Sequence, residues 1–360
     1  MTESSTPHLS SFGATPRIFP RPSYPPIRVA LFHEIKSLIW SSGALGTMLV
    51  FAVQPLYVFF VQYLHDKGYS EAYIFSAVLN CMHTAVWFLV NVPLLLCDNF
   101  GYFQQYKLFR APGQKPSFTL IRENIATALL MQATINPILA YYLHDHWVSL
   151  GMQPLAATLP RWQDVFASML CGYVFNTVMF YLTHRMFHTK ALYFLHKQHH
   201  QFAGTIAPAA EHANPVEVVI ANIIPTFYGV LLFGCKHPLV IISWFGMRLQ
   251  ETYLSHSGYC FLNTWFDWIG LAHAEQAIFH DHHHTSNRGN FGSMLLDQIF
   301  GTMDHFVAIG CHAGYLQRGQ DQRELKKAPE DEVHTTAPEP QQSLNSSPRT
   351  RRSTKKLTKD

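Results

Sequence analysis

The chain has 360 residues, of which 48% are hydrophobic and 14% are charged. Soluble domains carry about 25% charged residues, so this composition indicates a membrane protein. The formal net charge of +3 is too small to indicate a nucleic-acid-binding protein, and no nucleic-acid partner is expected. The six cysteines form no CxxC pair, which argues against a disulfide framework and against a thiolate metal site.

The N-terminal part is expected to enter the membrane after a polar leader. Residues 1–36 contain many prolines and no signal-peptide core, so a disordered Pro-rich leader is predicted. Residues 37–65 and 72–97 contain no Asp, Glu, Lys or Arg. Each run exceeds the ~20 residues that cross a hydrocarbon core of ~30 Å. With the polar turn at 66–71 between them, they are predicted to form a transmembrane hairpin.

Three further apolar regions follow. Residues 124–144 and 165–184 are uncharged and are predicted to be the third and fourth long spans. Residues 218–235 and 237–255 are predicted to form a short hydrophobic hairpin whose second half, which contains Arg248 and Glu251, is only partly embedded. The predicted domains are N-terminal transmembrane helices at 37–164, a second domain at 165–306, and a polar, mostly disordered tail at 307–360.

The distribution of basic residues predicts the orientation in the membrane. Arg17, Arg21, Arg28 and Lys36 precede the first span, and the loop at 98–123 is also basic. Under the positive-inside rule both regions are cytosolic, and the end of the fourth span is then cytosolic too. A multi-pass protein is expected, with its functional residues facing the cytosol.

Histidines gather in three clusters of helical spacing. The clusters are His184 and His188; His196, His199 and His200; and His280, His283 and His284. Residues three or four apart lie on one helix face, so each cluster can direct its imidazoles to a common point. The predicted fold is an all-α membrane protein, with four long transmembrane helices, a short hydrophobic hairpin and a cytosolic helical cap that carries these histidines.

The number and type of candidate ligands indicate two metal ions. Together with His256, the clusters supply nine imidazoles, whereas one ion takes about four to six ligands. A structural zinc site would often use cysteine, and a carboxylate-bridged di-iron bundle would show Glu-x-x-His pairs, which these clusters lack. A histidine-rich dimetal site is predicted, with iron as the metal.

The order HxxxH, HxxHH and, after a hydrophobic hairpin, a second HxxHH resembles the fatty acid hydroxylase / sterol desaturase superfamily of membrane di-iron oxygenases. The resemblance covers roughly residues 165–304 and includes NPVE at 214–217 and ETYLSHSGY at 251–259. The stretch FHDHHHTSNRGNFGSMLLDQIFGTMD at 279–304 is similar to C4-methylsterol oxidases.

This resemblance implies O2-dependent hydroxylation of an unactivated C–H bond in a lipid, by two histidine-ligated, non-haem iron ions. It also implies residence in the endoplasmic reticulum membrane. The chain has no haem-binding HPGG element, so electrons are expected from cytochrome b5 and its NAD(P)H reductase. Nearby polar residues expected to orient the imidazoles are Glu217, Asp281, Asp297 and Asn214.

One position departs from the family pattern. Many members have histidine where this chain has Asn214, in the sequence NPVE. His212, two residues earlier, is expected to be the tenth ligand in its place. If His212 points away, Asn214 could bind weakly through its amide oxygen or hold a water molecule.

Other functions remain open from the sequence. Within the same chemistry, the substrate could be a sterol or a fatty acyl, sphingoid or alkane chain. A histidine-rich metal transporter is less favoured, because it would place ionisable residues in the middle of its spans, whereas these clusters lie at span ends. A zinc hydrolase is the remaining alternative.

Overall fold

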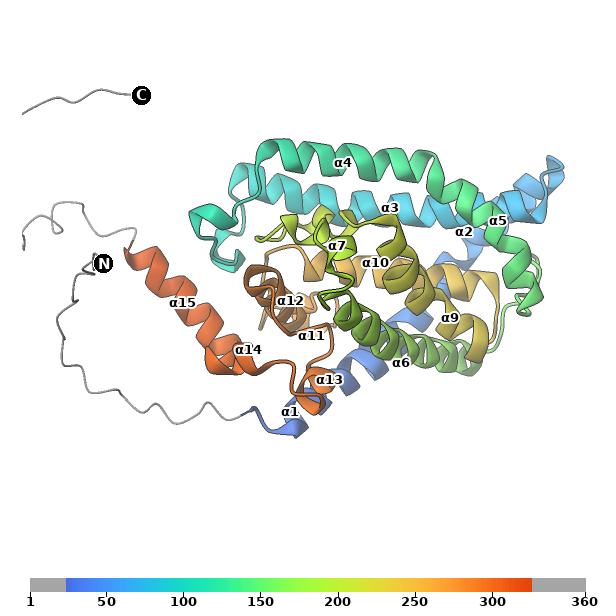
Figure 1. Cartoon of the computed structure of the whole chain (residues 1–360). Coiled ribbons are helices and arrows are strands. Elements are labelled where there is room, and N and C mark those ends of the chain that lie inside the picture. Colours follow the sequence, from blue (N-terminus) through green and yellow to red (C-terminus); the bar gives the residue numbers. More distant parts are fainter. Residues whose placement is uncertain (1–23, 326–360) are drawn as a thin grey trace, which may run out of the picture.

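The computed structural model describes residues 24–325, and Figure 1 shows their arrangement. Within that range the chain forms helices and loops with no strand, so the all-α prediction is confirmed. Long helices run side by side, and short helices gather around one end of them (Figure 1).

The first long helix begins earlier than predicted. Helix α1 (Ile27–Ile35) continues through a π-helical stretch (Lys36–Leu45) into α2 (Gly46–Asp66). The structure therefore has helix in the last part of the predicted leader, and residues 1–23 lie outside the described range. The helix starts directly after Pro26, which is extended at φ −51° and ψ 133°, because the Pro25–Pro26 pair disfavours helix before it.

The predicted third span is divided. Helix α3 (Glu71–Phe100) is followed by a loop with short 3-10 turns at Gln104–Tyr106 and Pro112–Gln114, then by α4 (Phe118–Ala133) and α5 (Ile135–Ser149). The break lies at Thr134, at φ −129° and ψ −74°. Pro137, in the first turn of α5, cannot donate the backbone hydrogen bond that a continuous helix needs, which explains the break.

Four helices of the described range are long and apolar enough to cross a membrane, and the chain is a multi-pass membrane protein. Their ranges are 27–66, 71–100, 162–187 and 215–233. The predicted number is confirmed, but the set differs: residues 215–233, expected as half of a short hairpin, are among the four, whereas residues 124–144 are divided between α4 and α5. This helix joins α8 (Pro215–Glu217), a π-helical stretch (Val218–Ile223) and α9 (Ile224–Phe233), and α10 (Pro238–Ser255) follows it.

Close packing fixes α6 (Trp162–Phe187) against α9. A Cβ atom on Gly229 would lie 2.7 Å from Phe175 Cβ and 3.1 Å from Gly172 Cα, so only glycine allows this approach. The indole of Trp244 on α10 donates to Thr226 O at 2.6 Å, which ties α10 to the same pair. These contacts set the direction of α6, whose last turn carries the first histidine cluster.

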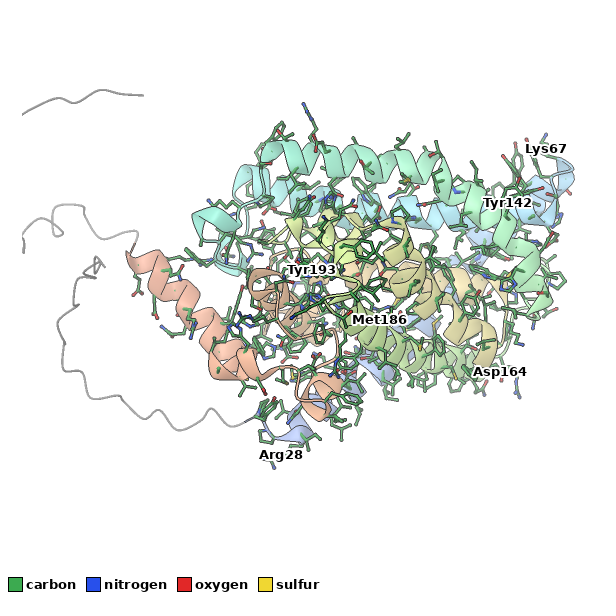
Figure 2. All side chains as sticks on the ribbon, in the orientation of Figure 1. Arg28, Lys67, Tyr142, Asp164, Met186 and Tyr193 are labelled. Carbon is green, nitrogen blue, oxygen red and sulfur yellow. The ribbon has the colours of Figure 1, made fainter. Side chains whose placement is uncertain are left out.

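Short helices form the cap at the end of α6. They are α7 (Tyr193–His196), α11 (Trp265–Trp268), α12 (Ala274–Ser286), α13 (Met294–Ile299), α14 (Asp304–Ala308) and α15 (Cys311–Leu325), with 3-10 turns at His199–Gln201 and Ala207–Glu211. The structure has helix up to Leu325 where a mostly disordered tail was predicted from 307, and residues 326–360 lie outside the described range. Figure 2 shows Asp164 at one end of α6 and Met186 near the other end, in the middle of the molecule beside the cap.

Candidate metal centre

Nine of the ten predicted ligands come together in two groups. Within each group, all candidate ligand atoms lie within 4.8 Å of one another. The five-histidine group is His184, His188, His196, His200 and His283, and the four-histidine group is His199, His256, His280 and His284. The groups are adjacent, since the ring centroids of His200 and His284 are 4.7 Å apart.

The two HxxHH motifs divide their histidines between the groups. The members four residues apart stay together: His196 and His200 enter one group, and His280 and His284 enter the other. The remaining member, His199 or His283, enters the opposite group. On α12 this division follows from helical geometry, because adjacent residues point about 100° apart. Between α7 and the following 3-10 turn, the chain is not one continuous helix, yet it produces the same division.

Within each group, the Nε2 atoms of the imidazoles face one another. His184 Nε2 lies 3.2 Å from His196 Nε2, and His200 Nε2 lies 3.1 Å from both His196 Nε2 and His283 Nε2. In the other group, His280 Nε2 is 2.8 Å from His256 Nε2 and 3.1 Å from His284 Nε2.

The opposite ring nitrogens show which atom carries the proton. The Nδ1–H groups of His184, His256 and His283 donate to the carbonyls of Phe291 (2.9 Å), Thr252 (2.8 Å) and Gly289 (2.6 Å). His284 Nδ1–H donates to Phe202 O at 3.1 Å. Each of these imidazoles, when neutral, has a bare lone pair on Nε2. Lone pairs directed at one point repel one another unless a cation lies between them, so the geometry fits two metal ions.

Burial keeps the imidazoles in the neutral form that binds metal. Burial, together with the neighbouring histidines, lowers the pKa of His188 to about 2 and of His200 to about 3. Burial likewise lowers the pKa of His256 to about 4 and places the pKa values of His283 and His284 well below the usual range. At neutral pH no proton competes with a metal ion for these nitrogens.

The four predicted supporting residues take different positions. Glu217 Oε1 lies 2.8 Å from His196 Nδ1, so this carboxylate contacts a candidate ligand directly. Asp297 Oδ1 accepts from Phe291 N at 2.9 Å, and Phe291 O accepts from His184. Asp297 therefore supports His184 indirectly, through the backbone of Phe291. Burial raises the pKa of Asp297 to about 7. Asp281 accepts hydrogen bonds from Arg110 and Thr205, not from an imidazole of residues 24–325, and Asn214 Oδ1 caps α8 by accepting from Val216 N at 2.9 Å.

Replacing Glu217 with glutamine is expected to weaken metal binding by about 10- to 100-fold, the usual cost of removing a group that orients a metal-bound histidine. The amide keeps the size of the side chain but replaces the carboxyl group beside His196. Metal retention during dialysis against a graded chelator series measures the effect. Unchanged retention would show that Glu217 does not act on the site.

His212 lies outside both groups. Its Nε2–H donates to Gln201 Oε1 at 2.7 Å, and its ring packs against Phe202 at a centroid distance of 5.1 Å. Position 214 supplies no imidazole, and its amide oxygen is occupied by the α8 cap. The two groups therefore contain nine histidines, and residues 212–214 add no tenth.

We expect His212→Ala to retain the full metal content, because its ring nitrogen bonds a side-chain amide instead of facing the groups. Asn214→Ala removes a helix cap and is expected to lower stability by about 1 kcal/mol. Elemental analysis of the two purified variants tests this expectation. Loss of metal in the His212 variant alone would make His212 a ligand after all.

Long-range contacts that were not predicted hold α12 in place. Asp281 is fully buried and pairs with Arg110 from the loop after α3. It also accepts hydrogen bonds from Thr205 Oγ1 (2.8 Å) and from the hydroxyl of Tyr315 on α15. On the same helix, His282 Nε2 lies 3.0 Å from His305 Nδ1, away from both groups. Residues 110, 205, 281 and 315 are far apart in the sequence and follow no shared spacing, so no local signal could have found these contacts.

Comparison with known proteins agrees with this geometry. The fatty acid hydroxylase family model matches residues 169–302. The very-long-chain aldehyde decarbonylase GL1-11 of Oryza sativa subsp. indica is 30% identical over 243 residues, covering 65% of this chain and 88% of that protein. The methylsterol monooxygenase 2-2 of Arabidopsis thaliana is 30% identical over 249 residues, covering 67% of this chain and 90% of that protein. The chain belongs to the fatty acid hydroxylase family.

Membership in the fatty acid hydroxylase family makes this protein an oxidoreductase, as the resemblance in the sequence implied. No solved structure matches the chain. The match covers the end of α6, both HxxHH motifs and α13, and therefore every histidine of the two groups.

Proposed function

We propose that this protein is a membrane-bound, non-haem di-iron monooxygenase that hydroxylates an unactivated C–H bond of a lipid, with a 4-methylsterol as its substrate. The observation that carries the proposal is the pair of adjacent histidine groups, five and four in number, with lone pairs converging in each. Imidazole ligands suit iron. When bound, the iron pair would supply a two-electron oxidation in which one oxygen atom of O2 enters the lipid and the other leaves as water.

The chain itself would hold and isolate this chemistry. Backbone carbonyls fix the Nδ1 protons of four histidines, so the Nε2 atoms stay directed inward. The ligands of both groups are mostly buried, and His199, His256, His280 and His284 are each at most 6% exposed. A site protected from water favours oxidation of the lipid over loss of the oxidant to solvent.

The sterol assignment depends on the relatives. The GNF and DQIFGT segments resemble C4-methylsterol oxidases, but in the structure they support the histidines: Gly289 O and Phe291 O accept from His283 and His184. Their presence does not therefore choose a substrate. Methylsterol monooxygenases among the relatives support a sterol, and aldehyde decarbonylases of equal identity support a second candidate, oxidation of a long acyl chain or aldehyde.

The proposed setting is the endoplasmic reticulum membrane, with the metal site facing the cytosol and electrons from cytochrome b5 and its NAD(P)H reductase. Two basic residues support this orientation. Lys36 in the first long helix pairs with Asp267 at 3.3 Å, and Arg110 in the loop after α3 pairs with Asp281, so both lie on the side of the cap. Basic residues favour the cytosolic side of a membrane. We also propose that residues 165–306 form the catalytic domain.

Labelled oxygen tests the proposed reaction. Membranes containing the full chain, cytochrome b5, its reductase and NADH are incubated under 18O2 with a 4-methylsterol and a long-chain fatty acid, and the His283→Ala variant serves as control. Label in the sterol, absent from the control, supports the proposal. Label only in the acyl lipid would favour the second candidate, and no label in any lipid would refute the oxygenase assignment. Lipid profiling of a deletion strain, with accumulated 4-methylsterols as the expected result, provides the test in cells.

A further inference from the structure

A cavity of about 100 Å³ lies beside the four-histidine group. His256 and His280 both line it, whereas no member of the five-histidine group does. Most of the remaining wall comes from the first long helix, α6, α10 and α12. An engineered protein cavity of about 150 Å³ holds one benzene molecule, so this smaller cavity cannot enclose a whole lipid.

The wall of this cavity is polar, unlike the helices that form it. Five of the first seven residues of α10, from Pro238 to Trp244, are buried apolar residues, whereas its last turns bring Arg248, Glu251 and Thr252 to the cavity. Buried polar groups are costly unless they are hydrogen-bonded. Across the cavity, the Glu34 carboxylate is hydrogen-bonded: it accepts from Tyr173 at 2.7 Å and from Ser293 at 2.5 Å.

Arg248 lines the cavity with a charged donor. One terminal nitrogen of its guanidinium pairs with Glu251, and its Nε is enclosed by protein atoms and faces no open space. The pairing with Glu251 leaves the second terminal nitrogen without a hydrogen-bond partner within residues 24–325. A bound acceptor would stabilise this charged donor.

Thr252 connects the cavity to the metal site. Its carbonyl accepts from His256 Nδ1 at 2.8 Å, and the residue lines the cavity that His256 also borders. A group bound by the Thr252 side chain therefore lies one helical turn from a candidate ligand. Thr177 on α6 is another hydroxyl-bearing residue of the wall.

We propose that this cavity binds the oxygen-bearing end of the lipid substrate, a hydroxyl or carbonyl oxygen that accepts hydrogen bonds from the Arg248 guanidinium and from the Thr252 hydroxyl. The apolar body of the lipid extends out of the cavity, which is too small to enclose it. The carbon that is oxidised is then one close to the polar end, not one in the distal hydrocarbon. This inference rests on the proposed oxygenase function and narrows its substrate class.

Binding of matched lipid pairs tests the inference without turnover. The full-length, iron-loaded protein is titrated in lipid nanodiscs without reductant, using a 4-methylsterol with a free 3-hydroxyl and its 3-deoxy analogue, and a long-chain primary alcohol and the alkane of equal length. We expect the oxygenated member of at least one pair to bind about 10-fold more tightly or better, the usual value of a hydrogen bond to a charged group.

Variants on one helix assign the preference. Thr252→Val keeps the shape of the side chain and removes its hydroxyl, and Arg248→Met removes the guanidinium. Each is expected to reduce the preference to within about 2-fold of unity. Ser243→Ala is the control, because Ser243 is a buried α10 residue that does not line the cavity, and its preference should match the wild type. If Arg248→Met does not fold because it leaves Glu251 unpaired, the preference is measured in Thr252→Val and in the double variant Arg248→Met with Glu251→Gln, which removes the unpaired charge.

The outcomes separate the inference from the proposed function. Equal binding within both pairs, or a preference that both cavity variants retain, overturns the inference and leaves a water-filled cavity. A preference for the alcohol without any for the sterol supports the inference and contradicts the sterol assignment. Oxidation of the sterol by variants that keep the wild-type preference contradicts the inference and leaves the sterol assignment intact.

Discussion

Replacing His283 with alanine is expected to abolish lipid oxidation and to remove the metal ion held by the five-histidine group. His283 Nε2 lies 3.1 Å from both His188 Nε2 and His200 Nε2, so it lies at the centre of that group. Loss of a supporting residue around a metal site costs about 10- to 100-fold, and loss of a ligand should cost more. Metal content per chain and product formation are both measured.

Adjacent residues on α12 provide the controls. His284→Ala should affect the four-histidine group instead, and His282→Ala should preserve metal and activity, because His282 faces His305 at 3.0 Å. Thermal unfolding of the metal-free proteins should be similar for all three. Equal metal content in the His283 and His282 variants would contradict the assignment of the two groups.

Replacing Arg110 with alanine is expected to destabilise the folded protein by about 3–5 kcal/mol, the usual cost of leaving one partner of a buried ion pair. The Asp281 side chain is 0% exposed, and Arg110 is its charged partner among the described residues. Asp281 lies between His280 and His284 on α12, so metal retention should fall as well. Loss of the folded state in a denaturant titration in detergent measures the change.

An exposed pair is the matched control for this prediction. Arg161 and Asp164 form an ion pair at 3.1 Å, but their side chains are 79% and 42% exposed. Such exposed pairs contribute little to stability, so Arg161→Ala should leave it almost unchanged. A similar loss of stability in the Arg110 and Arg161 variants would mean that the burial of Asp281 does not cause the destabilisation.

Most of the metal centre could be predicted from residue spacing. Helical periodicity on α6 and α12 placed His184 with His188 and His280 with His284, and the histidine after the hairpin, His256, joined them as expected. Spacing could not show that His199 joins the histidines of α12, or that His283 joins those of α6 and α7. These pairings depend on how α7 and α12 face each other. His212 was the weakest prediction for the same reason: its direction is set by Gln201 and Phe202.

The fold was predicted less completely at its ends. Composition alone suggested polar, unstructured segments around residues 27–36 and 307–325, yet both are helical and hold the cap in place. Glu34 bonds Tyr173 and Ser293, and Tyr315 bonds Asp281. These are single long-range contacts with no periodic pattern, so the sequence carries no local signal for them. The break at Thr134 did have one, since Pro137 removes a helical donor.

Metal analysis of the intact protein tests the central claim most directly. The chain is purified anaerobically, loaded with ferrous iron, and analysed for iron per chain in the wild type and in the His283→Ala and His284→Ala variants. The two-group structure predicts two iron ions per wild-type chain and the loss of one ion in each variant. A single ion per chain, or zinc that iron cannot replace and that supports no lipid oxidation, would contradict it.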